Sequence, residues 1–155
     1  MTPWDDLETP LAPLPRFYVE APDKRKDWAE IDRQAALFAA MHRLAPRVLG
    51  YAIPNAGKRS PHKARREGIM AGVFDTRWEW RAPLTAVIEI KGYTADGRAG
   101  KLRVEQIEYG NRMHDLGHHV ACFFDPLAAV GWLREIGFPV AEATRLEILR
   151  KDGLA

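Results

Sequence analysis

The pentapeptide Val87–Lys91 carries two charged side chains within an otherwise apolar strand pattern. Side chains alternate along a strand, so Glu89 and Lys91 share one face while Ile88 and Ile90 share the other. Acids and lysines are depleted in strands, and a buried charge is costly unless it is paired or bound to a metal. Taken alone, the pattern favours a surface ion pair on a half-exposed strand over a functional site.

An acid upstream changes that interpretation. Asp75 opens the preceding predicted strand, after a segment in which Gly68 and Gly72 permit a tight approach of the backbone. If the two strands pair, Asp75 and Glu89 can offer carboxylate oxygens to one hard cation, which suits Mg²⁺ or Mn²⁺ rather than zinc. Such a cation polarises a phosphodiester and lowers the pKa of an attacking water. Lys91, on the same face, would orient that water or stabilise the charge that grows on the phosphate.

Hydrophobic periodicity and turn signals predict the elements that must position these residues. The predicted elements are a helix from Asp27 with a stripe of Glu30, Gln34, Leu37, Met41 and Leu44, a strand over Arg47–Ile53, a short basic helix after Ser60-Pro61, strands over Asp75–Trp80 and Leu84–Lys91, a flexible loop over Gly92–Gly100, a helix over Val104–Leu116, a strand over His118–Phe124, and a helix from Asp125-Pro126 to Gly137. The order α-β-α-β-β-α-β-α predicts an α/β fold with a mixed central sheet flanked by helices.

The 155 residues fit a single domain, and a composition of 46% hydrophobic and 28% charged residues is that of an ordinary globular protein. We expect an irregular proline-rich arm over residues 1–26, the domain over 27–137 and an extension over 138–155. No apolar run has the length of a membrane span, and the acidic N-terminus does not resemble a signal peptide. These features predict a cytoplasmic protein, located with the nucleoid or with phage or host DNA if the protein is prokaryotic or viral. The single cysteine, Cys122, excludes an internal disulfide and is expected in the core.

The net charge of +2 does not itself indicate a nucleic-acid-binding protein, but its distribution is uneven. The segment 58–66 holds six basic or histidine side chains and no acid: Lys58, Arg59, His62, Lys63, Arg65 and Arg66. Such clustering is expected at a surface that contacts a phosphate backbone. A merely solvated face explains it equally well, and charge alone leaves both interpretations open.

An acid after a glycine-rich loop, followed by Glu-X-Lys on the next strand, resembles the signature of the PD-(D/E)XK nuclease superfamily. More narrowly, the chain is similar to the VRR-NUC domain family over about residues 27–137. The matching pieces, in chain order, are Glu30 with Gln34, Ile53–Arg59, Gly68–Asp75, Ile88–Lys91, Leu102–Gln106 and Gly117.

The resemblance implies a single restriction-endonuclease-like domain with Mg²⁺- or Mn²⁺-dependent endonuclease activity on structured DNA. Stand-alone members tend to resolve four-way (Holliday) junctions, and the resemblance supports a homodimer whose candidate contact surfaces are the Trp78–Trp80 strand and Phe138–Leu149. The implied metal ligands are Asp75, Glu89 and the backbone carbonyl of Ile90, and the implied catalytic residues are Glu30, Asp75, Glu89, Lys91 and Gln106. The expected DNA-binding residues are Asn55, Lys58, Arg59, Lys63, Arg65 and Arg66.

Three departures from the family pattern stand out. Phe74 replaces a usual proline before the metal aspartate, and Arg103-Val104 replaces Ser-Pro, so the following helix loses its cap. Glu30 has a competing explanation, because Asp27 and Glu30 have the spacing of a capping box. Two alternatives to a junction nuclease remain. One is a flap or restriction-type DNA nuclease, and the other is a DNA-binding module that has lost catalysis.

Overall fold

The structure is a computed structural model that describes residues 12–54, 60–151 and 153. Its elements are β1 (Tyr18–Val19), α1 (Glu30–Leu44), β2 (Leu49–Ala52), α2 (Pro61–Arg66), β3 (Thr76–Glu79), β4 (Thr85–Ile90), α3 (Val104–Asp115), β5 (His119–Phe123), α4 (Pro126–Glu135) and α5 (Arg145–Lys151). From α1 to α4 the elements follow one another as α-β-α-β-β-α-β-α, with β1 before them and α5 after them. None of the helices within the described ranges is both long and apolar enough to cross a membrane.

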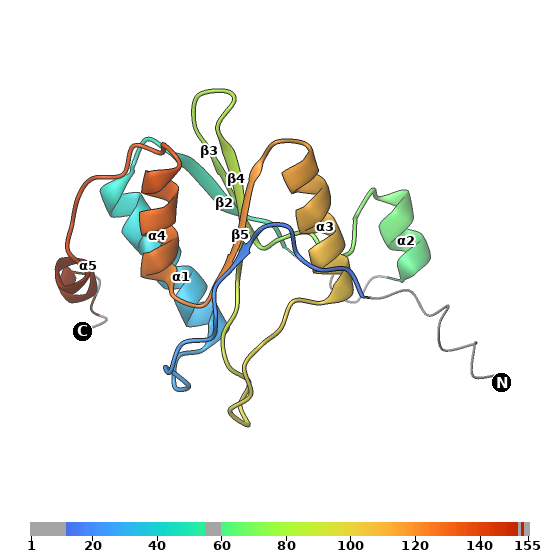
Figure 1. Cartoon of the computed structure of the whole chain (residues 1–155), viewed down its shortest axis with the longest axis horizontal. Coiled ribbons are helices and arrows are strands. Elements are labelled where there is room, and N and C mark those ends of the chain that lie inside the picture. The colour runs from blue at the N-terminus through green and yellow to red at the C-terminus, as the bar shows by residue number, and fades with distance from the viewer. Residues whose placement is uncertain (1–11, 55–59, 152, 154–155) are drawn as a thin grey trace.

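The five strands form one mixed sheet in the order β1-β5-β4-β3-β2. β2, β3 and β4 are antiparallel neighbours, whereas β4 and β1 each run parallel to β5. Helices α1 and α4 pack together against one face of the sheet, and α3 packs against the other (Figure 1). The chain is therefore a single α/β domain whose mixed sheet lies between two layers of helices, as the sequence predicts.

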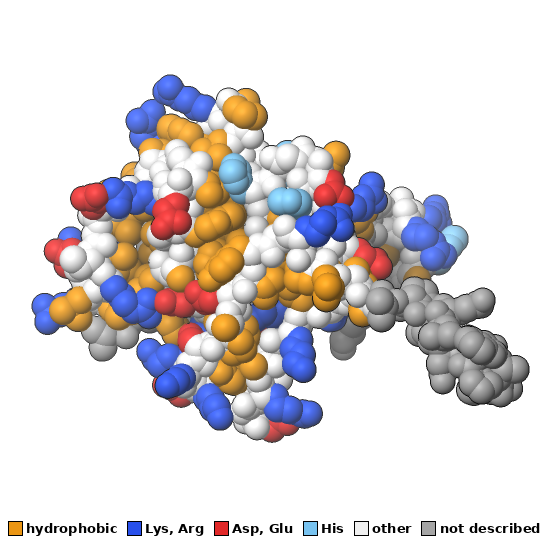
Figure 2. All heavy atoms as spheres, viewed as in Figure 1, with side chains coloured by type: hydrophobic (Ala, Val, Ile, Leu, Met, Phe, Trp, Pro, Cys, Tyr) orange, Lys and Arg blue, Asp and Glu red, His pale blue; other side chains and the backbone are white. Residues whose placement is uncertain are grey.

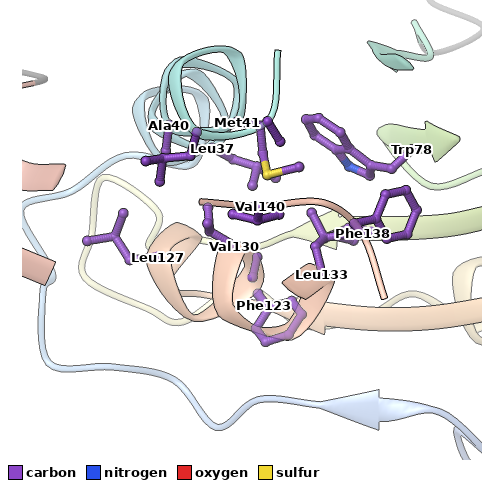
Figure 3. Close-up of a cluster of buried hydrophobic side chains, with 14 of the residues drawn as sticks. Leu37, Ala40, Met41, Trp78, Phe123, Leu127, Val130, Leu133, Phe138 and Val140 are labelled. Atoms are coloured by element: carbon purple, nitrogen blue, oxygen red, sulfur yellow. The ribbon is translucent and has the colours of Figure 1, made fainter. Parts of the chain in front are cut away.

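Strand alternation divides the interior into two cores. Ile88 and Ile90 point into the larger core, where α1 and α4 meet the sheet around Leu37, Met41, Trp78, Phe123 and Leu133 (Figure 3). Val87 points the other way, into the smaller core beneath α3 with Phe17, Phe74, Val120 and Cys122. Cys122 is 1% exposed, which confirms this cysteine as a core residue. Burial, together with the charge of Glu89, raises the pKa of its thiol to about 12.

The prediction of an irregular arm over residues 1–26 is wrong for the segment Phe17–Val19. Tyr18 and Val19 pair with Ala121 and Cys122 as β1, and Phe17 is buried. A Cβ at Gly110 of α3 would lie 2.4 Å from the Phe17 ring, so only glycine lets the helix pack this closely. The segment Phe17–Glu20 is free of proline and rich in strand-forming side chains, a short signal hidden among the surrounding prolines.

The two surfaces predicted for dimer contacts are largely used inside the domain. Phe138, Val140 and Ile148 belong to the larger core, so the segment after residue 137 is part of the domain rather than an extension. Trp78 is 2% exposed and donates its indole N–H to the Thr76 hydroxyl at 3.0 Å. The Trp78 indole is therefore part of the core and offers almost no surface to a partner.

One buried arginine ties the loop ahead of α1 to the rest of the fold. Arg33 is 0% exposed, and its Nη1 and Nη2 donate to the two Asp23 carboxylate oxygens at 2.6 and 3.0 Å. The remaining donors reach the carbonyls of Trp28, Arg25 and Phe124 at 2.8, 2.6 and 2.7 Å. Because all its donors are used, Arg33 fixes the start of α1 against the chain that follows β5.

Replacing Arg33 should destabilise the protein strongly. Arg33→Ala removes the guanidinium donors of the Asp23 carboxylate and of three carbonyls, at an expected cost of about 3–5 kcal/mol in the free energy of unfolding. Arg33→Lys should also be destabilised, since an ammonium cannot reach all four partners. Urea denaturation measures the effect, with Arg134→Ala, which breaks an exposed pair with Glu142, as a control expected within about 1 kcal/mol of the parent. Equal stabilities of the two alanine variants would contradict this account.

Candidate active site

The predicted site residues come together at one end of the sheet. Glu89 and Lys91 lie at the carboxyl end of β4, and Asp75 directly precedes β3. The starts of α1 and α3, which carry Glu30 and Gln106, lie at this same end (Figure 1). Residues that are up to 76 positions apart in the chain therefore converge here because two helices begin where one strand ends.

Glu89 is the centre of this cluster. Its side chain faces the α3 side of the sheet, and the residue is only 1% exposed. Oε2 accepts from the Asp75 backbone N–H at 3.0 Å, while Oε1 accepts from Gln106 Nε2 at 2.6 Å and pairs with Lys91 Nζ at 3.2 Å. The register of β3 and β4 produces the contact, since Thr76 lies opposite Ile88 and places Asp75 beside Glu89.

Lys91 and Gln106 form the second half of the cluster. Lys91 is 8% exposed, and its Nζ donates to Gln106 Oε1 at 3.1 Å. The same oxygen accepts from the Arg103 backbone N–H at 3.0 Å. As predicted, Arg103 gives α3 no side-chain cap, and Gln106 satisfies this first N–H instead. The Gln106 side chain therefore both caps the start of α3 and reaches Glu89 and Lys91.

Two glycines allow the helices to approach the site. Gly72 has a φ of +83°, and a Cβ there would lie 2.3 Å from the Glu105 carbonyl oxygen, which sets the start of α3 against the loop before Asp75. A Cβ at Gly92 would lie 2.7 Å from the backbone nitrogen of Glu30. The first approach is the kind that the glycine-rich segment predicted. The second was missed, because a glycine that opens a loop looks the same in sequence whether or not a helix packs on it.

Glu30 lies at the edge of the cluster and is not part of a capping box. The N-cap of α1 is Ala29, without a side-chain hydrogen bond, and Asp27 instead pairs with Arg25 at 3.2 Å. The capping-box explanation is therefore wrong. Burial raises the pKa of the Glu30 carboxyl, the positive charge of Lys91 opposes that shift, and the Gly92 N–H is hydrogen bonded to it. The contacts thus direct Glu30 towards the site.

Electrostatics at the site disfavour two negative charges. Burial, followed by the negative charge of Asp75, raises the pKa of Glu89 to about 7 despite the nearby Lys91 ammonium. Burial also raises the pKa of Asp75. Without a further cation, the two carboxyls therefore resist full ionisation at neutral pH.

The donor set fits a hard divalent cation that keeps open positions. Asp75 and Glu89 supply carboxylate oxygens, and main-chain groups of β4 alternate in direction. Since Ile88 O accepts from the Thr76 hydroxyl and Lys91 N–H bonds to β5, the Ile90 carbonyl faces the Asp75 side. Within the described ranges, no three His, Cys, Asp or Glu side chains could hold an ion by themselves. Mg²⁺ suits such a site, because it commonly takes one or two carboxylates together with water and substrate phosphates.

Phe74 fills the place where the family pattern has proline. Its side chain is 0% exposed, with ring centroids 5.6 Å from Phe17 and 5.3 Å from Tyr109. This stacking anchors the backbone immediately before Asp75 beneath α3. Phe74 therefore holds this part of the backbone by side-chain packing, where the family pattern has the rigid ring of proline, and the Asp75 carboxylate remains at the site.

The predicted DNA-binding cations of α2 are exposed. The Ser60 side chain accepts from the Lys63 N–H at 3.2 Å and caps α2, which confirms the helix start predicted at Ser60-Pro61. None of the α2 side chains is buried, and Lys63, Arg65 and Arg66 point to solvent, with blue side chains gathered over this helix in Figure 2. The other predicted contacts, Asn55, Lys58 and Arg59, lie outside the described residues.

Comparisons of the chain with protein-family models, with curated proteins and with solved structures find no significant match.

The close approach at Gly92 predicts a steric effect. Gly92→Ala should destabilise the fold by about 1–3 kcal/mol, because the new methyl group would push the start of α1 and Glu30 away from Lys91. Gly131→Ala in α4 is the matched control, since its Cβ would meet nothing within 4 Å and alanine favours a helix by about 1 kcal/mol. Thermal and urea unfolding measure both variants. A Gly92→Ala protein as stable as the parent would refute the packing described here.

The raised pKa of Glu89 predicts a pH-dependent affinity for metal. A carboxyl that holds its proton up to about pH 7 must release it to bind a cation, so Mn²⁺ or Mg²⁺ affinity should rise as pH increases from 6 to 8. Calorimetric titrations in buffers with different ionisation enthalpies should report proton release near pH 7. Glu89→Gln should lose the metal response, whereas the exposed Glu135→Gln should keep it. Metal affinity that is constant over this range would contradict the predicted titration.

Proposed function

We propose that this chain is a Mg²⁺- or Mn²⁺-dependent endonuclease that hydrolyses phosphodiester bonds in DNA, with branched DNA and above all four-way junctions as its substrates. We further propose that its α/β domain is restriction-endonuclease-like and related to VRR-NUC domains. The proposal rests on one observation above the others. Glu89 is 1% exposed, lies beside a second carboxyl, and contacts Lys91 and Gln106.

A structural role alone explains this arrangement poorly. A buried ion pair contributes little net stability, and here the pair includes a second acid, which makes ionisation harder. A divalent cation between Asp75 and Glu89 would offset their repulsion. Such strain is expected where a group is kept for binding or catalysis rather than for stability.

Each residue then has a role that its contacts support. Asp75, Glu89 and the Ile90 carbonyl would hold the cation, which when bound polarises the phosphodiester and makes a nearby water more acidic. Lys91 stabilises the negative charge that develops on the phosphate, and Gln106 holds the Lys91 ammonium through Oε1. Glu30, a half-buried carboxyl of raised pKa, accepts a proton from the attacking water.

The cations of α2 support DNA as the substrate. In the chain, this helix follows β2 and precedes the loop that carries Asp75, and its cations Lys63, Arg65 and Arg66 are exposed and open to the phosphates of a duplex. The preference for four-way junctions comes from the resemblance to VRR-NUC domains. A junction requires two strands to be cut, and an isologous homodimer supplies two symmetry-related sites.

Cleavage assays test the proposal. Labelled four-way junction, flap, duplex and single-stranded DNA are incubated with and without Mg²⁺ and with excess chelator. Asp75→Ala and Glu89→Ala should abolish cleavage in folded proteins, while Lys91→Ala should reduce the rate by about 10²- to 10³-fold. Glu135→Ala, which removes an exposed acid of α4, should retain full activity.

The outcomes separate the alternatives. DNA binding without cleavage by the parent protein would instead support a module that has lost catalysis. A monomer that prefers flaps would retain the nuclease but refute junction cleavage. Full activity in Glu89→Ala would place any nuclease site elsewhere.

A further inference from the structure

Positive charge near the acids is distributed unequally between buried and exposed groups. Burial raises the pKa of Asp75, and the charges of Lys91 and Arg103 oppose that rise. Burial also raises the pKa of Glu30, where the charges of Lys91 and Arg33 oppose it. Lys91 is 8% exposed and donates to Gln106, whereas Arg33 is 0% exposed with all of its donors in use. Of these three cations, only Arg103 lies at the surface.

Within the described ranges, the Arg103 guanidinium has no bonded partner. It provides no cap for α3, whose first N–H groups are served by other contacts. In the part of the chain that the structure describes, its guanidinium makes no hydrogen bond and no ion pair. A guanidinium that is exposed and unpaired beside acidic residues remains available to a ligand.

The backbone of Arg103 is nevertheless held firmly at the site. Its N–H donates to Gln106 Oε1 at 3.0 Å, and Gln106 in turn contacts Glu89 at 2.6 Å. The preceding Leu102 packs against the smaller core. Gln106 therefore links the backbone of Arg103 to Glu89, while the Arg103 side chain extends into solvent.

A phosphodiester that approaches this site meets an electrostatic difficulty. Asp75, Glu89 and Glu30 repel it, and the Lys91 ammonium lies inside the cluster rather than at its opening. An exposed cation at the rim would offset that repulsion, and a guanidinium can bind two phosphate oxygens at once.

We propose that the Arg103 guanidinium binds a backbone phosphate of the DNA strand that enters the site and so draws the scissile bond towards Asp75 and Glu89. The inference rests on the proposed nuclease function and adds to it a substrate-binding residue outside α2. Arg103 contributes mainly to substrate affinity, whereas Lys91 contributes to the chemical step.

The test compares three variants: Arg103→Ala, Arg103→Lys and Arg112→Ala. Arg112 is the matched control, because it is an exposed arginine near the other end of the same helix. Dissociation constants for junction DNA are measured in Ca²⁺ over a range of salt concentrations, and kcat and KM are measured in Mg²⁺. Titration with Mn²⁺ alone checks that each variant still binds the metal.

Arg103→Ala should weaken DNA binding by about ten-fold, as expected for a lost charge-assisted hydrogen bond, and should flatten the log–log salt slope by about 0.9 on duplex arms. KM should rise more than kcat falls, and Mn²⁺ affinity should be preserved. Arg103→Lys should keep the parent's salt slope, because the positive charge remains. It should recover only part of the affinity, because an ammonium lacks the planar pair of donors that binds two phosphate oxygens. Arg112→Ala should match the parent.

Two results would overturn the inference in different ways. If the parent cleaves DNA but Arg103→Ala matches Arg112→Ala in affinity and salt slope, the phosphate contact is refuted and the nuclease stands. If the parent neither binds nor cleaves any of the DNAs, the proposed function and this inference both fail.

Discussion

The burial of one carboxyl group at the end of β4 constrains the architecture around it. Glu89 lies on the α3 face, where its neighbours along β4 and β5 are the core residues Val87 and Cys122. A carboxyl in that position requires hydrogen-bond donors from every side, because an unsatisfied buried charge costs several kcal/mol. The Asp75 backbone, Gln106 and Lys91 supply those donors. The two Glu89 carboxylate oxygens thus hold three parts of the fold together: the residue before β3, the start of α3 and the carboxyl end of β4.

Residues outside the charged cluster also hold the site in place. Phe74 and Leu102 both pack in the smaller core under α3, and Gly72 lets that helix approach the loop before Asp75. On the opposite face, Arg33 secures the start of α1, from which Glu30 reaches towards Gly92. The site is therefore held by rigid elements of both helical layers rather than by long loops, which is the arrangement that precise positioning of reactive groups requires.

Local sequence predicted the elements well and the ends of the chain poorly. Two kinds of local signal are confirmed by the structure. One is the alternation of Glu89 and Lys91 with Ile88 and Ile90, and the other is the pair of helix starts at Ser60-Pro61 and Asp125-Pro126. Phe17–Val19 and Phe138–Ile148 were misjudged, because their burial depends on surfaces formed by β5 and α1 that no short window of sequence contains.

For the site, sequence located the Asp75 and Glu89 pair, since strand register follows from the hairpin that joins β3 to β4. It could not decide between a cap and a site residue for Glu30, nor reveal what Gly92 packs against. Both answers depend on α1 lying against the loop after β4, a tertiary contact with no sequence signal of its own.

The central claim is that Asp75 and Glu89 together bind a divalent cation, and a crystal grown in Mn²⁺ tests it most directly. Anomalous scattering should locate a manganese ion about 2.1 Å from one oxygen of each carboxylate, on the side that the Ile90 carbonyl faces. The Glu89→Gln protein, crystallised in the same way, should show no ion there. An empty position between the two carboxylates of the parent protein at saturating Mn²⁺, with Glu89 still bonded to Gln106 and Lys91, would contradict the account.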